Sequence, residues 1–177
     1  MLFHGISLRA GAQQPEPWLR GTLTNVPAVG RGVLHALELA RGDVDRWCES
    51  LSEDDLNARP FELPSIAFHL RHIARSLDRL LAYAEGNQLS AEQIAALKSE
   101  MDPGAGREAL FAEFGQGLES AAQRVLVLAA GDLEQPRFVG KKQLPTSVGG
   151  LLVHLADHTQ RHVGQVVTTA KVLLAGK

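Results

Sequence analysis

The fold and the candidate chemistry both follow from residues 151–165, which read LLVHLADHTQRHVGQ. Three histidines, His154, His158 and His162, recur in this run every four residues. On an α-helix four residues advance about 400°, so each imidazole lies roughly 40° around the helix and about 6 Å further along than the previous one. The apolar residues of this helix form a stripe that contains His162, has His158 at its edge and leaves His154 closer to water.

His158 and His162 are the expected chelating pair, because two neutral imidazoles at positions i and i+4 can bind one transition-metal ion. His154 and His162 are about 12 Å apart along the axis, so all three cannot easily share one ion. A third ligand must then come from another helix, and the candidates are His69 and His72 on a predicted second helix. Its apolar stripe centres about 50° from His69 and about 110° from His72, which slightly prefers His69 as the inward residue. A site at the edge of a bundle could still use His72, so spacing leaves the choice open.

The composition restricts the possible partners and locations. The chain has 177 residues, of which 45% are hydrophobic, enough for one domain with a core. A net charge of −2 and a single pair of adjacent lysines argue against a nucleic-acid partner. No apolar run approaches the roughly 20 residues needed to cross a bilayer, and residues 1–12 do not read as a signal peptide. With one cysteine, Cys48, the chain fits a reducing compartment, and we expect a soluble cytoplasmic protein with no membrane partner.

Helical periodicity covers most of the chain. We expect residues 1–23 to form a loosely ordered arm and residues 24–177 to form one domain. Four long helices are predicted, with a short extra helix between the second and third. The first long helix begins near Asn25, its expected N-cap, and the second runs from about Pro64 to Glu85. A capping box of Ser90 with Gln93 opens the short helix, which runs through about Ser99, while the third long helix ends at Gly131 and the last runs from a cap at Thr146 or Ser147 to about Leu174. No alternating strand pattern is present, and residues 131–145 are expected to be an irregular connection. The predicted fold is therefore all-α, a four-helix bundle, in which metal sites are commonly built from inward side chains on facing helices.

Two short segments carry a resemblance to a known family. Residues 65–76 read SIAFHLRHIARS and residues 158–165 read HTQRHVGQ. A histidine followed by an aliphatic residue and alanine, and then H-x-x-x-H-x-G-Q on the last helix, resemble the DinB-like metal-binding family. The resemblance implies a DinB-like four-helix bundle, often a homodimer, that holds a divalent ion such as zinc or nickel. It assigns the metal ligands to His72, His158 and His162, with His69 as a neighbour of the site.

The resemblance also implies an activity, since some members of that family resemble S-transferases that join bacillithiol, mycothiol or glutathione to electrophiles. Three neutral imidazoles leave the ion its full positive charge, so a thiol bound there would be deprotonated without a protein base. We find no carboxylate that the sequence places at the site, since Asp157 faces outward, and this favours thiol transfer over hydrolysis. We therefore expect a metal-dependent S-transferase acting on a small-molecule thiol and an electrophile. The alternatives are a metal-dependent hydrolase using bound hydroxide and a non-catalytic bundle that binds a ligand or partner.

The remaining reactive or charged residues are expected to be structural. Cys48 is interpreted as a small buried hydrophobe rather than a nucleophile. Arg71, Arg75 and Arg79 are predicted to lie on the outward side of the second helix and to form a solvated face with Asp78.

Overall fold

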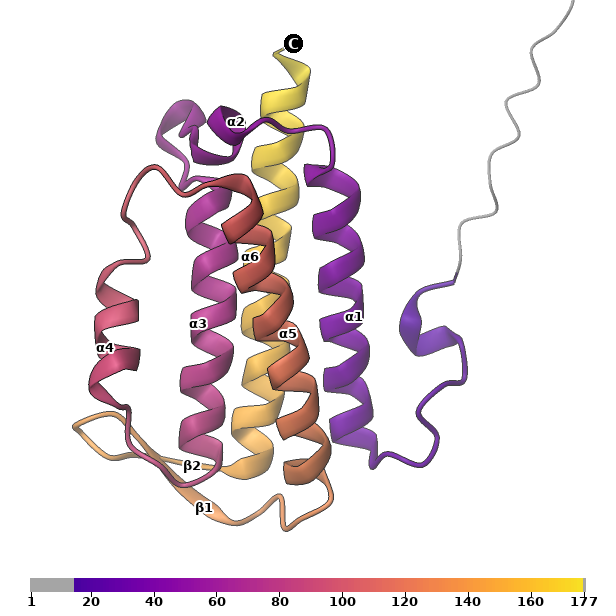
Figure 1. Ribbon diagram of the computed structural model, residues 1–177. Helices are drawn as coiled ribbons and strands as arrows, with labels where there is room; N and C mark the ends of the chain where they lie inside the picture. The colour runs from indigo at the N-terminus through magenta and orange to yellow at the C-terminus, as the bar shows by residue number, and fades with distance from the viewer. Residues whose placement is uncertain (1–14, 177) are drawn as a thin grey trace, which may run out of the picture.

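The computed structural model of the protein describes residues 15–176 (Figure 1). Residues 1–14 of the predicted arm and Lys177 lie outside the described residues. The elements, in chain order, are η1 (Pro17–Leu19), α1 (Ala28–Cys48), α2 (Glu53–Asn57), η2 (Pro60–Glu62), α3 (Ile66–Ala84), α4 (Ala91–Lys98), α5 (Arg107–Ala129), β1 (Pro136–Val139), β2 (Leu144–Ser147) and α6 (Val148–Ala175). The described chain is therefore mostly helical, with one small sheet.

Serine side chains begin most of these helices, because their hydroxyls accept hydrogen bonds from otherwise unpaired backbone N–H groups. Ser65 accepts from Phe68 at the start of α3, and Ser147 accepts from Gly150 at the start of α6. The predicted capping box of Ser90 with Gln93 begins α4. The expected cap at Asn25 is wrong: α1 begins at Ala28, with Pro27 in the cap position and no side-chain cap. The preset φ of a proline suits the first turn of a helix, so the backbone rather than a side chain sets this boundary.

The long helices α1, α3, α5 and α6 pack side by side around a shared apolar core. Helix α1 packs against α5 and α6, and α3 also packs against α5 and α6, so each long helix has two main neighbours. Helices α1 and α6 run in one direction and α3 and α5 in the other (Figure 1). The approach of α5 to α3 depends on Gly117, because a Cβ atom built there would lie 2.8 Å from the Cβ of Ala74. The pairing of α3 with α6 brings together the two helices that carry the candidate ligands.

A short hairpin joins α5 to α6, where an irregular connection without strands was expected. β1 and β2 pair antiparallel, with Pro136 opposite Ser147 and Val139 opposite Leu144. Each strand has four residues, which is too short to produce a recognisable alternation of apolar and polar residues. Gly140, in the connecting turn, has a φ of +69°, a conformation that glycine adopts without strain. The prediction of an all-α fold is therefore corrected, because the structure contains one two-stranded sheet in addition to the helices.

The short helix α4 lies beside α3 and is attached to it by polar contacts, since none of its own residues is buried. The Arg75 guanidinium donates to the carbonyl of Ala96 at 2.7 Å, and the Gln93 side-chain amide donates to Asp78 at 2.6 Å. The predicted solvated arginine face is therefore wrong for Arg75 and Arg79, whose side chains are only 18% and 11% exposed. The prediction failed because the periodicity of α3 carries no information about α4 and the residues after it, which cover this side of the helix.

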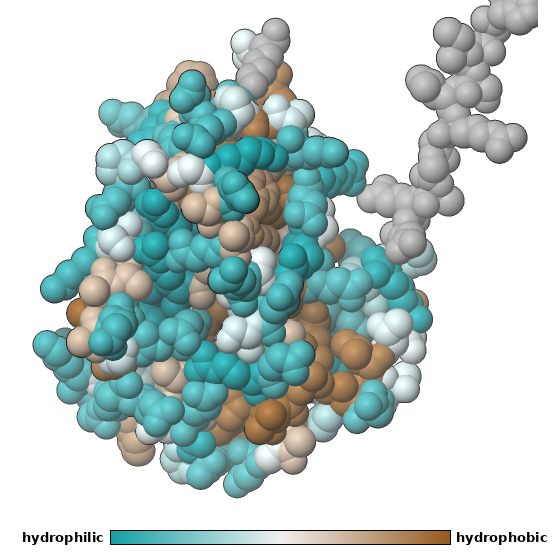
Figure 2. Space-filling model, viewed as in Figure 1, coloured by the Kyte–Doolittle hydropathy of each residue, from teal (hydrophilic) through white to brown (hydrophobic). Residues whose placement is uncertain are grey.

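The visible surface is mostly hydrophilic, with apolar side chains gathered over the lower part of α1 and α5 (Figure 2). Leu34, Leu118 and Leu126 line a groove between these two helices. None of the residues that line this groove belongs to α3 or α6. The homodimer expected from the family resemblance stays a prediction. No helix among residues 15–176 is long and apolar enough to span a membrane.

Candidate metal centre

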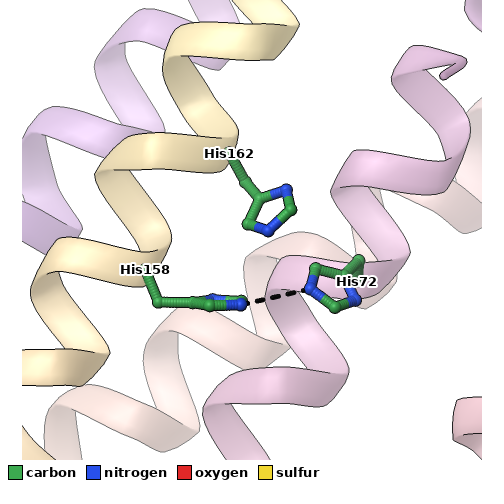
Figure 3. Close-up of side chains that lie close together, drawn as sticks. All are labelled: His72, His158 and His162. Carbon is green, nitrogen blue, oxygen red and sulfur yellow. Dashed lines mark hydrogen bonds between the residues drawn. The ribbon is translucent and has the colours of Figure 1, made fainter. Parts of the chain in front are cut away.

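Three histidine side chains meet between α3 and α6 (Figure 3). His72 extends from α3, while His158 and His162 extend from successive turns of α6. Each offers one ring nitrogen, and these three atoms lie within 4.8 Å of one another. The Nε2 atoms of His72 and His158 are 3.2 Å apart. The sequence-predicted residues are thus brought together by the fold.

This donor set fits a divalent transition-metal ion. Nitrogen ligands at about 2.0–2.1 Å from a tetrahedral ion lie about 3.4 Å from each other. The separation of 3.2 Å between Nε2 of His72 and Nε2 of His158 is close to that value, so little movement is needed for both to bind one ion. All three rings are partly exposed, which leaves a side of the cluster open to a small molecule. Imidazole-only sites suit zinc, nickel, copper and iron.

A buried carboxylate that sequence analysis did not find lies behind His72. Glu100, just beyond α4, accepts a hydrogen bond from Nδ1 of His72 at 2.7 Å, and its other oxygen accepts one from Arg79 at 2.6 Å. Its side chain is 4% exposed. Burial raises the pKa of Glu100, but the hydrogen bonds from His72 and Arg79 and the charge of Arg79 outweigh that effect and hold the pKa below its ordinary value. Glu100 is therefore ionised at neutral pH, and the Nδ1 atom of His72 carries the proton.

This arrangement prepares His72 for metal binding. With the proton on Nδ1, the lone pair of Nε2 faces His158 and the cluster. Histidines that bind metals commonly donate their other N–H to a carboxylate, which orients the ring and increases the basicity of the ligating nitrogen. No signal in the sequence identifies Glu100, because its place depends on the path of α4 back along α3.

His69 lies deeper than His72 and contacts the cluster from behind. It is 1% exposed, which agrees with the inward position that periodicity favoured. Its Nδ1 atom is 3.0 Å from Nδ1 of His162, so one of the two nitrogens donates to the other. Nε2 of His162 is left to face the cluster. The Nε2 atom of His69 has no hydrogen-bond partner among the described residues.

Two histidines of the cluster, His158 and His162, and the adjacent His69 are held neutral by their surroundings. Burial, followed by the charges of neighbouring histidines, lowers the pKa of His158 to about 4. Burial and the charge of His72 do the same for His162, whose pKa is also about 4. His69 is lowered to about 4 by burial and by His162 and His72. Neutral imidazoles present free lone pairs at neutral pH, as ligation of a cation requires.

The other singled-out residues lie outside the cluster. His154 is exposed, and the centroid of its ring is 5.6 Å from that of His158. Asp157 faces outward, as expected, and pairs with Arg161 at 2.6 Å. Cys48 is fully buried, and burial raises the pKa of its thiol to about 11, which confirms its interpretation as a buried hydrophobe.

The fold and this cluster define a helical protein with a candidate site for one divalent metal ion. A family model described as the DinB superfamily matches residues 36–166, and the chain belongs to that superfamily. The matched region contains all three clustered histidines and Glu100. A comparison with curated proteins gives no significant match.

Proposed function

We propose that this protein is a four-helix-bundle metalloprotein that binds one divalent ion, zinc or nickel, through His72, His158 and His162 and transfers a small-molecule thiol to an electrophile. The convergence of three ring nitrogens within 4.8 Å of one another is the observation that carries the proposal. Membership of the DinB superfamily is compatible with it.

The choice of thiol chemistry rests on which groups at the site are free. A divalent ion held by neutral imidazoles lowers the pKa of a thiol that it binds and so supplies a thiolate at neutral pH. Both oxygens of Glu100 are engaged, one by His72 and one by Arg79, so this carboxylate does not serve as a general base for water. Cys48 is buried with a raised pKa, so the nucleophilic sulfur must come from a separate molecule. These contacts favour thiol transfer over hydrolysis.

The residues around the site have definite tasks in this proposal. Glu100 orients His72 and keeps its proton on Nδ1. His69 holds Nδ1 of His162 and so directs Nε2 towards the cluster. The open side of the cluster admits the thiol and the electrophile.

A conjugation assay tests the proposal. The metal-loaded protein is mixed with bacillithiol, mycothiol or glutathione and with monochlorobimane. In the reaction a carbon–sulfur bond forms, the carbon–chlorine bond breaks, chloride leaves and the thiol proton passes to the buffer. We expect at least one thiol to be conjugated by the wild-type protein and by Lys171→Ala, whose exposed side chain contacts Trp47 rather than the cluster, but not by His158→Ala. Equal rates in all three proteins, or ester hydrolysis without any thiol, would contradict the proposal.

A further inference from the structure

A cavity of about 270 Å³ opens onto the histidine cluster. Its lining includes two of the clustered histidines and side chains from α3, α4 and the connection between them, namely His72, His158, Leu80, Tyr83, Leu89 and Leu97. A molecule in this cavity would therefore contact His72 and His158. The volume lies just below the range of about 300–1,000 Å³ for sites that hold drug-sized molecules, which suits a small ligand.

The cluster is closed on the side of Phe68. The ring of Phe68 stacks on that of His72 with centroids 5.3 Å apart. A second cavity, lined by Phe68, Glu100 and Arg59, lies beyond this ring and is not lined by any of the three clustered histidines. A small molecule that approaches His72 and His158 is thus expected to do so through the first cavity.

The first cavity carries almost no net charge. Arg79 is the only arginine, lysine, aspartate or glutamate in its lining. Its guanidinium is neutralised by Glu100 at 2.6 Å and also donates to Ser76 at 2.9 Å. A guanidinium already engaged in this way has little to offer a carboxylate or phosphate, because its pairing with Glu100 would have to be broken. The side chains of the cavity therefore add no selection for an anionic ligand to that of the metal ion itself.

Apolar side chains give the cavity its binding surface. Leu80, Leu89 and Leu97 converge there from α3, the α3–α4 connection and α4. Tyr83 is 8% exposed, and its hydroxyl has no hydrogen-bond partner among residues 15–176, so it can bond to one polar group of a ligand. Such a lining suits an aliphatic or aromatic group with a single polar substituent.

We propose that this cavity binds the electrophilic substrate, and that this substrate is a small uncharged molecule with an apolar body. Its reactive end faces His72 and His158, and its body lies among Leu80, Leu89 and Leu97. The inference rests on the proposed function, since it assigns one substrate of the same site. Bacillithiol, mycothiol and glutathione are polar, so they do not match the apolar part of this lining.

Imidazole probes on the cobalt-loaded protein test the assignment without any turnover. Imidazole, 4-phenylimidazole and 4-(imidazol-4-yl)benzoate, whose carboxylate is too far from the ring nitrogens to chelate the metal, are each titrated while the visible absorption of the cobalt is followed. We expect 4-phenylimidazole to bind at least tenfold more tightly than imidazole. The probe with the carboxylate should bind no more tightly than 4-phenylimidazole. Similar affinities for all three probes, or a preference for the carboxylate, would overturn the assignment.

Two charged substitutions on α4 provide a matched comparison. Leu97, which lines the cavity, is 44% exposed, and Ile94, which does not line it, is 40% exposed. Leu97→Arg should abolish the preference for 4-phenylimidazole while leaving the affinity for imidazole unchanged, whereas Ile94→Arg should preserve the preference. The assignment would be overturned if both variants kept the preference for 4-phenylimidazole, or if both lost it. Failure of the wild-type protein to bind cobalt would refute the proposed function itself, and the substrate assignment with it.

Discussion

Replacing Glu100 by glutamine removes a charge from the site while preserving the shape of the side chain. Glu100 is 4% exposed in its side chain and accepts from Nδ1 of His72 at 2.7 Å. A hydrogen bond to a charged partner contributes about 1.5–3 kcal/mol and a neutral one about 1 kcal/mol. The change therefore removes about 1–2 kcal/mol of support for His72, and removal of such partners typically weakens metal affinity by about 10–100-fold. We expect the Kd for zinc to rise by that factor in Glu100→Gln.

The assay is competition for zinc with a chromophoric chelator near neutral pH, with unfolding of the metal-free protein measured separately. The second measurement is needed because Arg79 also loses its ionic partner, which should cost about 1–3 kcal/mol of stability. The double variant Arg79→Gln with Glu100→Gln removes the unpaired cation, and it should recover stability without recovering full metal affinity.

Glu113→Gln is the matched control. Glu113 also accepts from an arginine of α3, Arg75 at 2.6 Å, but it contacts no histidine and its side chain is 36% exposed. Its zinc affinity should equal that of the wild-type protein. Zinc affinity of Glu100→Gln equal to that of the wild type and of Glu113→Gln would refute the role of the carboxylate.

Three further predictions concern stability and reactivity. Three histidines near the site have their pKa lowered from 6.5 to about 4, so the unfolded chain binds more protons between these values. The metal-free protein should therefore lose stability as the pH falls from about 6.5 to about 4, and urea midpoints that do not change over this range would contradict the assignment of neutral histidines. Gly117→Ala should lower the free energy of unfolding by about 1–3 kcal/mol, because the new Cβ would lie 2.8 Å from that of Ala74. Gly42→Ala, whose new Cβ meets nothing within 4 Å, should raise it by up to about 1 kcal/mol. Equal effects in urea unfolding would argue against close packing of α3 with α5. Cys48, with its pKa raised to about 11, should react with Ellman's reagent only after denaturation, and rapid labelling of the native protein would contradict its burial.

The helices could be predicted because their signals are local. The four-residue repeat of histidines on α6 and the capping box of Ser90 with Gln93 depend only on nearby residues. Periodicity also indicated that His69 faces inward, and it is 1% exposed. Inward placement alone, however, does not determine a ligand. The ring of His69 meets the far nitrogen of His162, whereas the more exposed His72 faces the space shared with His158.

The remaining parts of the site depend on tertiary contacts that leave no local pattern. Glu100 is 28 residues beyond His72 and reaches it only because α4 returns along α3. Arg79, predicted to face solvent, is covered by the same segment and is 11% exposed. The hairpin between α5 and α6 was missed because each strand has only four residues. Periodicity describes one helix at a time, so it misses a carboxylate supplied by a neighbouring segment.

The central claim is tested most directly by the metal content of the protein purified without an affinity tag or added metal, measured beside three variants. We predict close to one divalent ion per chain in the wild-type protein and in His69→Ala, and almost none in His72→Ala or His162→Ala. A native protein that contains no metal and takes up none when zinc or nickel is offered would contradict the account, as would a His72→Ala protein that keeps its ion.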